Sequence, residues 1–263
     1  IRRLMQGNKD DLGLAIALAE AQLVDRRPTD AMQTARGVLK RAETSVTAMK
    51  LLARSYLAME NGPTADSILG KALEIEKDPE VLFLRGHIAL KRGELEVAVK
   101  WFDAAIKENP HYVEALNNAS VLYLKVENYA AAHETMQKVV RYAPAFAPGW
   151  LNLGTAQRGV GKFEEAEKSW LKALELDPDK AFSRFNLGVL YLETQMPGRD
   201  REQQLTDSAD SLNAYKEAIG PTRREEITEV DRILTEVRRQ KELERERREE
   251  ELKGDDDDDD DDD

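Results

Sequence analysis

Few residues of this chain have the type and spacing that catalysis or metal binding needs. The three histidines, His87, His111 and His133, lie too far apart for any two to share one helical face as metal ligands. The absence of cysteine excludes disulfides, thiol nucleophiles and cysteine metal sites. Residues 159–162, Gly-Val-Gly-Lys, contain the glycines and lysine of a phosphate-binding loop, but neither Ser nor Thr follows the lysine. The sequence therefore predicts a non-enzymatic protein without metal or cofactor.

The elements that carry these residues are helical hairpins, most clearly in residues 147–180. In that stretch small and apolar residues recur at three- and four-residue steps, which place them on one helical face. The first set is Trp150, Leu153, Gly154 and Gln157, and the second is Ala166, Trp170 and Ala173. The glycines at 159 and 161 separate the two sets and predict a tight turn between two helices.

The same pattern recurs at steps of 33 or 34 residues along the chain. Small residues mark the expected closest approach of the two helices in each hairpin. In the first helices they are Ala19, Ala53, Gly86, Ser120, Gly154 and Gly188, and in the second helices Ala31, Ala65, Ala98, Ala132 and Ala166. A side chain larger than a methyl group would hold the helices apart.

The offsets of these residues, with Pro178 after the second helix, resemble the tetratricopeptide repeat (TPR), whose period is 34 residues. The resemblance implies an all-α, right-handed α-solenoid of about six hairpins across residues 12–221. The expected repeats lie near 12–45, 46–78, 79–112, 113–146, 147–180 and 181–221, after a lead-in at 1–11.

The sixth repeat departs from the period. Pro197-Gly198 opens a polar run, and the family offsets return at Ser211, Tyr215 and Ala218. The spacing predicts an insertion over residues 193–206. An inserted loop in a solenoid is often functional, but extra loop length is also tolerated at little cost in free energy, and both readings stay open.

Residues 222–253 predict one long helix. Ile227, Val230, Leu234 and Val237 form an apolar stripe, which should cap the last repeat. Residues 238–253 are almost wholly charged and predict a solvated stalk in preference to a dimer zipper, so a monomer is favoured. Residues 254–263, with nine aspartates, predict a disordered acidic tail because like charges repel one another.

By analogy with the TPR family, the first helix of each repeat lines a concave groove that binds a partner. The residues expected there are Lys50, Arg54, Phe83, His87, Asn117, Asn118, Leu151, Asn152, Phe182, Phe185 and Asn186. The resemblance implies that an asparagine ladder of Asn118, Asn152 and Asn186 binds an extended peptide backbone; alternatively, this asparagine belongs to the common repeat pattern and binds nothing.

TPR domains that bind a chaperone's C-terminal carboxylate place asparagines where this chain has Arg54 and Leu84. That carboxylate clamp is therefore not expected. The apolar residues Phe83, Leu151, Phe182 and Phe185 predict instead a peptide or helix with apolar anchors.

Charge and hydropathy narrow the range of partners. The net charge is −12, but nine of these charges belong to the run 255–263, so the body gives no electrostatic reason to expect nucleic acid. The sequence contains no apolar run long enough to span a membrane. It starts at Ile1 rather than Met, so we expect that an upstream segment has been removed.

The leading hypothesis is a protein–protein interaction scaffold that binds a peptide or helix in the concave groove. One alternative is a structural subunit of a larger assembly, bound through the convex face, the 193–206 loop or the stalk. Another is a regulatory domain of an enzyme encoded upstream. The layout also resembles bacterial envelope TPR lipoproteins of the gliding-motility machinery, which would favour the periplasm over the cytoplasm through a missing upstream signal.

Overall fold

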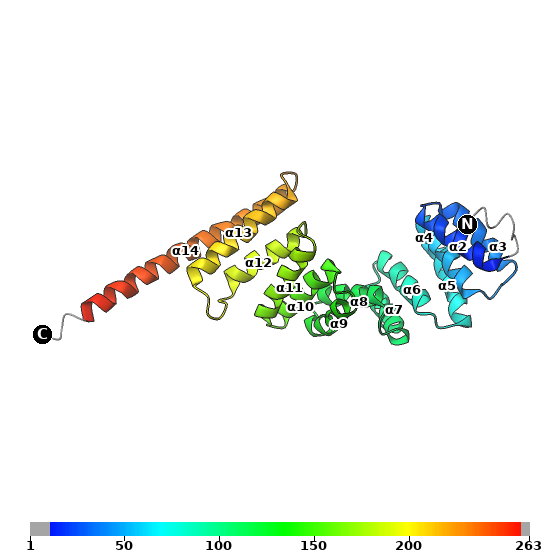
Figure 1. The fold of residues 1–263 in the computed structure, drawn as a ribbon, viewed down its shortest axis with the longest axis horizontal. Coiled ribbons are helices and arrows are strands. Elements are labelled where there is room, and N and C mark those ends of the chain that lie inside the picture. The colour runs from blue at the N-terminus through cyan, green and yellow to red at the C-terminus, as the bar shows by residue number, and fades with distance from the viewer. Residues whose placement is uncertain (1–10, 259–263) are drawn as a thin grey trace. The chain divides into compact units, whose positions relative to one another are not determined.

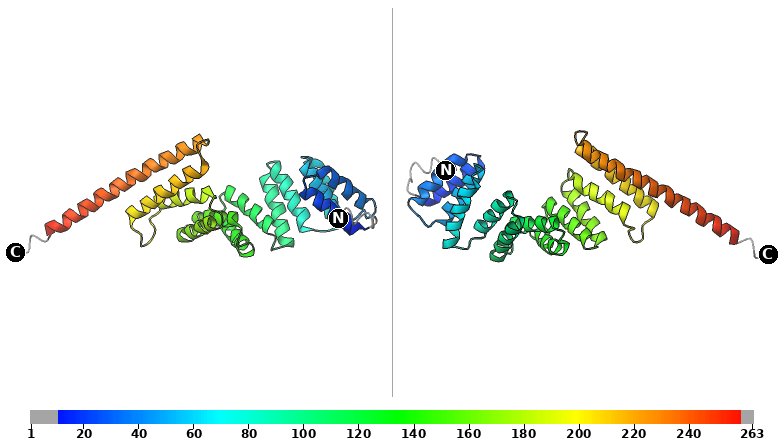
Figure 2. Two further views of the ribbon diagram at one scale, coloured as in Figure 1. Left: turned by 45° about the horizontal axis from the view of Figure 1, so that its top comes forward. Right: turned by 180° about the vertical axis from the view of Figure 1, so that it is seen from behind.

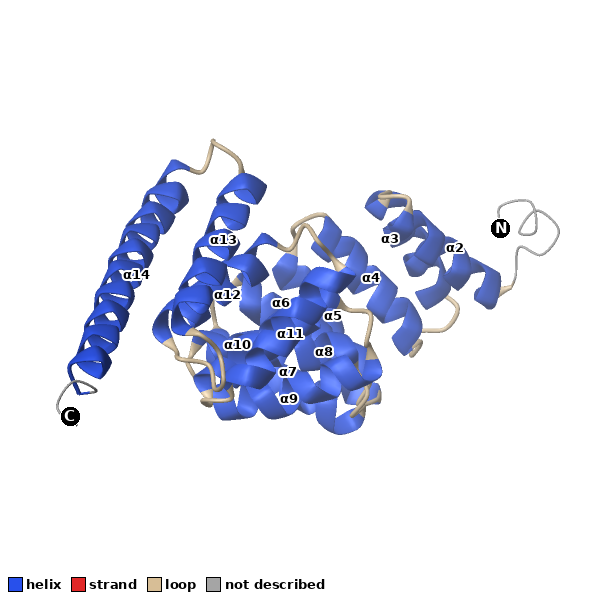
Figure 3. Cartoon of the chain, turned by 60° about the vertical axis from the view of Figure 1, so that its left-hand side comes forward, coloured by secondary structure: helices blue, strands red, loops and turns tan. Residues whose placement is uncertain are grey.

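The computed structural model describes residues 11–258, and these residues form thirteen α-helices without any strand (Figure 3). The predicted all-α solenoid fold is confirmed. In chain order the helices are α2 (Leu12–Val24), α3 (Pro28–Leu39), α4 (Val46–Ala58), α5 (Gly62–Ile75), α6 (Pro79–Lys91), α7 (Leu95–Glu108), α8 (Val113–Lys125), α9 (Tyr129–Tyr142), α10 (Ala147–Gly159), α11 (Phe163–Leu176), α12 (Ala181–Glu193), α13 (Arg201–Ile219) and α14 (Arg224–Asp258).

The chain divides into two compact units, an N-terminal unit of residues 1–122 and a C-terminal unit of residues 123–263. In the N-terminal unit α2 pairs with α3, α4 with α5 and α6 with α7 (Figure 1). In the C-terminal unit α10 pairs with α11 and α12 with α13, while α9 packs on α10 and α14 packs on α13 (Figures 1 and 2). Each unit is therefore a stack of antiparallel helical hairpins.

The turn inside each hairpin holds one residue in the left-handed region of backbone space. Gly93 and Gly161 have φ values of 77° and 78°. Arg26, Glu60 and Glu127 occupy the same turn position with φ values of 56°, 60° and 57°. Glycine adopts this conformation at no steric cost, whereas other residues are strained there. The glycine and lysine of residues 159–162 are thus explained as a turn.

The two helices of a hairpin touch where a small residue faces a large ring. A Cβ atom built on Gly86 would lie 2.6 Å from Phe102, and one built on Gly154 would lie 2.5 Å from Trp170. Phe102 is 0% exposed and Trp170 is 1% exposed. The small residues expected at these contacts, among them Ala53, are likewise buried. The predicted role of the small residues in helix packing agrees with these contacts.

The sixth hairpin differs from its predicted register. Gly188 faces Leu212 and the backbone oxygen of Ser208, whereas the predicted register places Tyr215 and Ser211 at these two positions. Leu212 follows Gly188 by 24 residues, whereas Trp170 follows Gly154 by 16, so the insertion adds 8 residues. The predicted register, with Tyr215 at the position of Leu212, implies 11. The error is one turn of helix, because a three-residue step returns to nearly the same face.

The insertion predicted at 193–206 is only partly a loop. Residues 194–200 form the loop, and the remainder lengthens α13 at its N-terminal end. Asp200 caps this extension by accepting a hydrogen bond from the backbone N of Gln203 at 2.8 Å. The buried side chain of Gln204 accepts from the backbone N of Met196 at 3.0 Å and donates to the oxygen of Tyr191 at 2.9 Å. The loop is therefore fastened to the start of α13.

The first half of α14 covers the last hairpin. Val230, Leu234 and Val237 are at most 5% exposed and form one core cluster with Leu212 and Tyr215 of α13. This burial supports the predicted capping role of the apolar stripe. The longer α13 also gives the charged half of α14 a surface to pack on, so the predicted stalk does not begin at residue 238.

The two ends of the chain were expected to be an acidic tail at 254–263 and a lead-in at 1–11. The helix α14 continues past Gly254, where the tail was expected to begin, and ends at Asp258. A single glycine costs only about 1 kcal/mol in a helix and need not end it. The rest of the expected tail, 259–263, lies outside the described residues, as does the lead-in except for Asp11, which caps α2 by accepting from the backbone N of Leu14 at 3.0 Å.

Candidate functional site

Two asparagines of the predicted ladder occupy the same position in consecutive hairpins of the C-terminal unit. Asn152 is the sixth residue of α10, and Asn186 is the sixth residue of α12. Both side chains are partly exposed, and neither amide is hydrogen-bonded to another residue in the described part of the chain. A primary amide offers two donors and an acceptor, so both groups are available to an extended backbone.

A cavity of about 300 Å³ lies beside Asn186. Its wall includes Thr155 and Arg158 of α10, together with the rings of Tyr129 and Trp170. The ring of Tyr129 covers Gly159 so closely that a Cβ atom there would lie 2.1 Å from it. The cavity therefore combines an aromatic lining with three polar side chains.

Charge at this site is balanced internally. Arg158 forms an ion pair with Glu193 at the end of α12. The hydroxyl of Thr155 donates to the backbone oxygen of Leu151 at 3.1 Å, and the indole Nε1 of Trp170 donates to the same oxygen at 3.0 Å. The amide of Asn186, which lines the cavity, has no hydrogen bond to a described residue, and neither has the amide of Asn152, which lies outside the lining. The arrangement suits a polar backbone better than a charged group.

The apolar residues predicted for the groove in the C-terminal unit differ in how much of their side chain is already packed within the fold. Leu151 packs against the core cluster of Trp170, and Phe185 packs against Tyr215 with ring centroids 5.3 Å apart. Phe182 is 54% exposed, and its ring centroid lies 6.0 Å from that of Tyr215. Of these three, Phe182 is the one with a largely free surface for a partner's side chain.

The predicted basic residues of the N-terminal unit already have acidic partners. Lys50 Nζ lies 2.8 Å from Asp78 and 3.0 Å from Glu80, and Arg54 lies 3.7 Å from Glu80. Burial by itself would lower the pKa of Lys50, but its bonds to Asp78 and Glu80 outweigh burial, so the pKa is raised. A partner carboxylate would have to displace these acidic residues.

Phe83 and His87, one turn apart on α6, are both partly buried. The ring centroid of Phe83 lies 5.6 Å from Phe102 and 5.2 Å from Tyr112, so it belongs to the hairpin's own aromatic packing. Burial, and then the positive charge of Lys91, lower the pKa of His87. His87 is therefore a neutral side chain near pH 7.

Asn117 and Asn118 lie on α8 in the N-terminal unit. The amide of Asn117 donates to Asn118 Oδ1 at 3.4 Å, and Asn117 Oδ1 is buried without a hydrogen-bond partner among the described residues. Asn118 belongs to a different unit from the other two asparagines of the ladder. Asn152 and Asn186 are the part of the ladder that lies within one unit.

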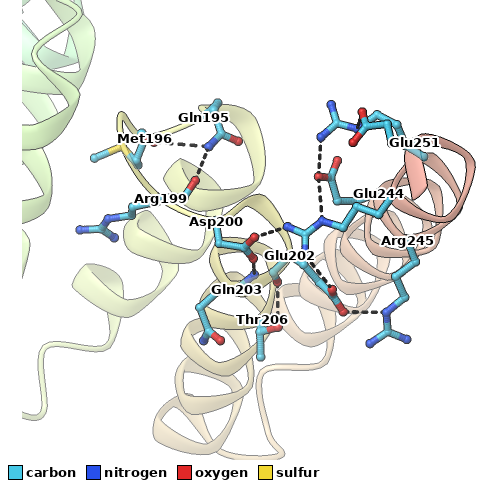
Figure 4. Close-up of polar contacts among 12 residues, drawn as sticks. Gln195, Met196, Arg199, Asp200, Glu202, Gln203, Thr206, Glu244, Arg245 and Glu251 are labelled. Carbon is cyan, nitrogen blue, oxygen red and sulfur yellow. Dashed lines mark hydrogen bonds and ion pairs between the residues drawn. The ribbon is translucent and has the colours of Figure 1, made fainter. Parts of the chain in front are cut away.

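A polar seam joins the start of α13 to the charged half of α14, and the sequence did not predict it (Figure 4). Lys241 Nζ donates to Thr206 Oγ1 at 2.7 Å, and Arg245 pairs with Glu202 at 2.6 Å. Arg248 pairs with Asp200, whose pKa is lowered first by the backbone hydrogen bond from residue 203 and then by this arginine.

The order of these contacts makes the two helices antiparallel, because rising numbers in α14 meet falling numbers in α13. The sequence could not predict the seam because the expected insertion over 193–206 places these residues in a loop, whereas α13 begins at Arg201. The acidic Asp200 and Glu202, together with an arginine-rich helix later in the chain, are the signal that could have revealed it.

Neither a metal site nor a membrane span is found in the described residues. Across residues 11–258, no three His, Asp or Glu side chains gather as a group that could hold a metal ion. Within the same range, none of the helices is both long and apolar enough to cross a membrane.

Repeated hairpins in which a small residue lies under a large ring define a helical-repeat protein. The chain contains tetratricopeptide repeats: models of the tetratricopeptide repeat family match residues 79–112, 113–146 and 147–180. These matches coincide with three consecutive repeats predicted from the spacing.

The chain is similar to several curated proteins, of which two are described. "Heat shock protein STI1" of Saccharomyces cerevisiae is 28% identical over 113 residues, which cover 42% of this chain and 19% of that protein. A "Hsp70-Hsp90 organising protein" of Plasmodium falciparum is 24% identical over 135 residues, which cover 50% of this chain and 54% of that protein. The chain thus spans about a fifth of the first relative and about half of the second.

Among solved structures, that described as "Functional Characterization of Pseudomonas Aeruginosa pilF" matches with a TM-score of 0.70 and 18% identity. The match covers 86% of this chain and 98% of the other. At this identity the likeness shows a shared fold.

Proposed function

We propose that this chain is a non-enzymatic protein–protein interaction scaffold that binds an extended peptide segment along α10 and α12 of its C-terminal unit. The observation that carries the proposal is the pair of uncommitted amides, Asn152 and Asn186, which lie one repeat apart. Asn186 also lines a cavity with aromatic residues in its wall. The organising protein named among the relatives supports scaffolding as the kind of function.

The physical reason concerns the backbone of the bound peptide. An extended peptide that enters a groove leaves water, and each backbone group that stays unpaired costs about 1–3 kcal/mol. An asparagine side chain can donate to a carbonyl and accept from an N–H at once. Two such side chains on successive hairpins would pair with two separate peptide groups, while the exposed ring of Phe182 would take an apolar side chain of the same segment.

The test begins with a random-peptide phage library selected on the full chain. The recovered peptides are synthesised, and their affinity is measured by fluorescence anisotropy. We expect the double variant Asn152→Ala with Asn186→Ala to weaken binding by at least about tenfold, the effect of losing one to two hydrogen bonds. The melting temperature should not change, because neither amide is bonded within the fold. Asn213→Ala, an exposed asparagine on α13, is the matched control.

Binding that survives the double variant unchanged would refute the groove as the peptide site, even if the chain remains a scaffold. Loss of binding together with a lower melting temperature would also count against it, since that outcome assigns the asparagines to stability.

Assembly into a larger complex through the convex face, the insertion or α14 is the alternative, and regulation of an enzyme encoded upstream remains a prediction. One observation favours the insertion as a binding element: its loop is fixed by Arg199, which bonds to the buried Glu167 at 2.7 Å. Deleting 197–207 would remove the buried Gln204 and Leu205, so substitution of the exposed Pro197 and Gly198 is the better test of complex formation.

A further inference from the structure

In the fourth and fifth hairpins, the first residue of the second helix has a large side chain that packs against the hairpin that follows. Tyr129 begins α9, and its ring covers Gly159, the last residue of α10 in the next hairpin. Phe163 begins α11 and packs against a core cluster that includes Leu187 and Leu190 of the next hairpin. A large side chain at this position therefore closes the gap between a hairpin turn and the following first helix.

The second hairpin lacks this side chain. Its second helix begins at Gly62, and a Cβ atom built there would meet nothing within 4 Å. A cavity of about 430 Å³ lies at this point, with Leu57, Pro63 and Ile88 among its lining residues. Proline restricts the residue before it, and glycine is the residue least affected, which accounts for a glycine ahead of Pro63. The consequence is an apolar space that a ring occupies in the fourth and fifth hairpins.

The rim of this cavity is mainly basic. Lys91 and Arg92 at the end of α6 line it, together with Glu60. Arg92 is engaged with Asp66 at 3.4 Å, whereas Lys91 forms no ion pair with any residue described by the structure. The lysine ammonium lies beside an apolar cavity and can pair with an incoming carboxylate.

We propose that the Gly62 cavity is a second binding site, which takes an aromatic side chain of a protein partner with an acidic residue next to it. The ring would occupy the space that Tyr129 and Phe163 fill in their own hairpins, and the carboxylate would pair with Lys91. This site lies in the N-terminal unit and does not depend on the asparagine groove of the C-terminal unit.

The test uses two capped dipeptides, N-acetyl-Glu-Phe-amide and N-acetyl-Lys-Phe-amide, titrated into the isotope-labelled full chain. Amide chemical shifts of residues 60–62 and 88–92 report binding. The expected dissociation constant for the acidic dipeptide is roughly millimolar, as suits one buried side chain. The basic dipeptide should bind about threefold to fivefold more weakly, the scale of one exposed charge contact.

Two variants separate the ring from the charge. Gly62→Phe fills the cavity and should abolish the shifts, whereas Gly70→Phe on the same helix, where a Cβ meets nothing, should leave them intact. Lys91→Glu should reverse the preference between the dipeptides without altering the fold, because Lys91 is exposed, and Lys71→Glu serves as its control.

Either of two results overturns the proposal: no shift with the acidic dipeptide at concentrations up to about ten times the expected constant, or shifts that persist in Gly62→Phe. Equal binding of both dipeptides to the wild type would overturn the role of Lys91. None of these outcomes bears on the asparagine groove.

Discussion

Replacing Gly86 by alanine tests whether close helix approach holds the hairpins together. The added Cβ would lie 2.6, 2.7 and 3.1 Å from three ring atoms of Phe102, whereas carbon atoms pack at about 3.5–4.0 Å. Phe102 is fully buried, and its ring packs on Phe83 with centroids 5.6 Å apart, so it has little room to retreat. The alanine must therefore push the two helices apart.

The magnitude follows from two opposing effects. Overpacking of this kind costs about 1–3 kcal/mol, and the higher helix propensity of alanine returns about 1 kcal/mol. We expect a net loss of up to about 2 kcal/mol. Gly70→Ala in the neighbouring helix α5 is the control, because its Cβ meets nothing within 4 Å. That variant should gain about 0.5–1 kcal/mol from helix propensity alone.

Urea unfolding followed by circular dichroism and by tryptophan fluorescence measures both changes, with Trp101 as the fluorophore next to Phe102 in the N-terminal unit. A second substitution, Phe102→Leu, tests the cause. It should cost less in the Gly86→Ala background than in the wild type, with a coupling of about 1 kcal/mol. Equal stability of Gly86→Ala and Gly70→Ala, or the absence of coupling, would refute the reasoning.

Three further outcomes are expected. In the left-handed turn position of the C-terminal unit, Gly161→Ala should lower the unfolding free energy by about 1–2 kcal/mol and Glu127→Gly should raise it by up to about 1 kcal/mol, as measured by urea unfolding. At the polar seam, Arg248→Ala should speed hydrogen exchange of the α14 backbone amides over 241–248, because it removes the ion pair with Asp200. Salt near ~0.5 M should have the same effect because it screens the ion pairs. Arg247→Ala should not, because Arg247 pairs only within α14. Burial, and then a neighbouring lysine, lower the pKa of His87 in the folded chain. The unfolded chain therefore binds a proton more readily than the folded chain, so the unfolding free energy should fall as the pH drops below about 6.5. His87→Gln should make this fall smaller.

Much of the fold could be predicted because the repeats encode local geometry. The spacing of Gly154 and Trp170 gives both the helical face and the partner across the hairpin, and the glycine at 161 marks the turn. The sixth hairpin was the exception: Leu212 and Tyr215 lie three residues apart on nearly the same helical face, so both registers fit the same helical period. Only the contact with Gly188 distinguishes them.

The candidate site was harder to predict than the fold. A repeat position indicates which way a side chain faces, but not whether it already has a partner. Lys50 and Phe83 occupy groove positions, yet the first is paired with Asp78 and the second is packed within its own hairpin. Asn152 occupies a groove position by the same spacing, and the structure leaves its amide without a hydrogen bond to a described residue.

The sequence by itself determined the hairpins, their turns and the apolar stripe of α14, because these depend on a helical period and on residue size, which are local properties. Only the tertiary structure decided the polar seam between α13 and α14 and the empty space at Gly62. The seam needs Asp200 to meet Arg248, and the cavity needs α6 to pass beside a glycine. Such juxtapositions depend on how neighbouring elements pack, which no single repeat's pattern records.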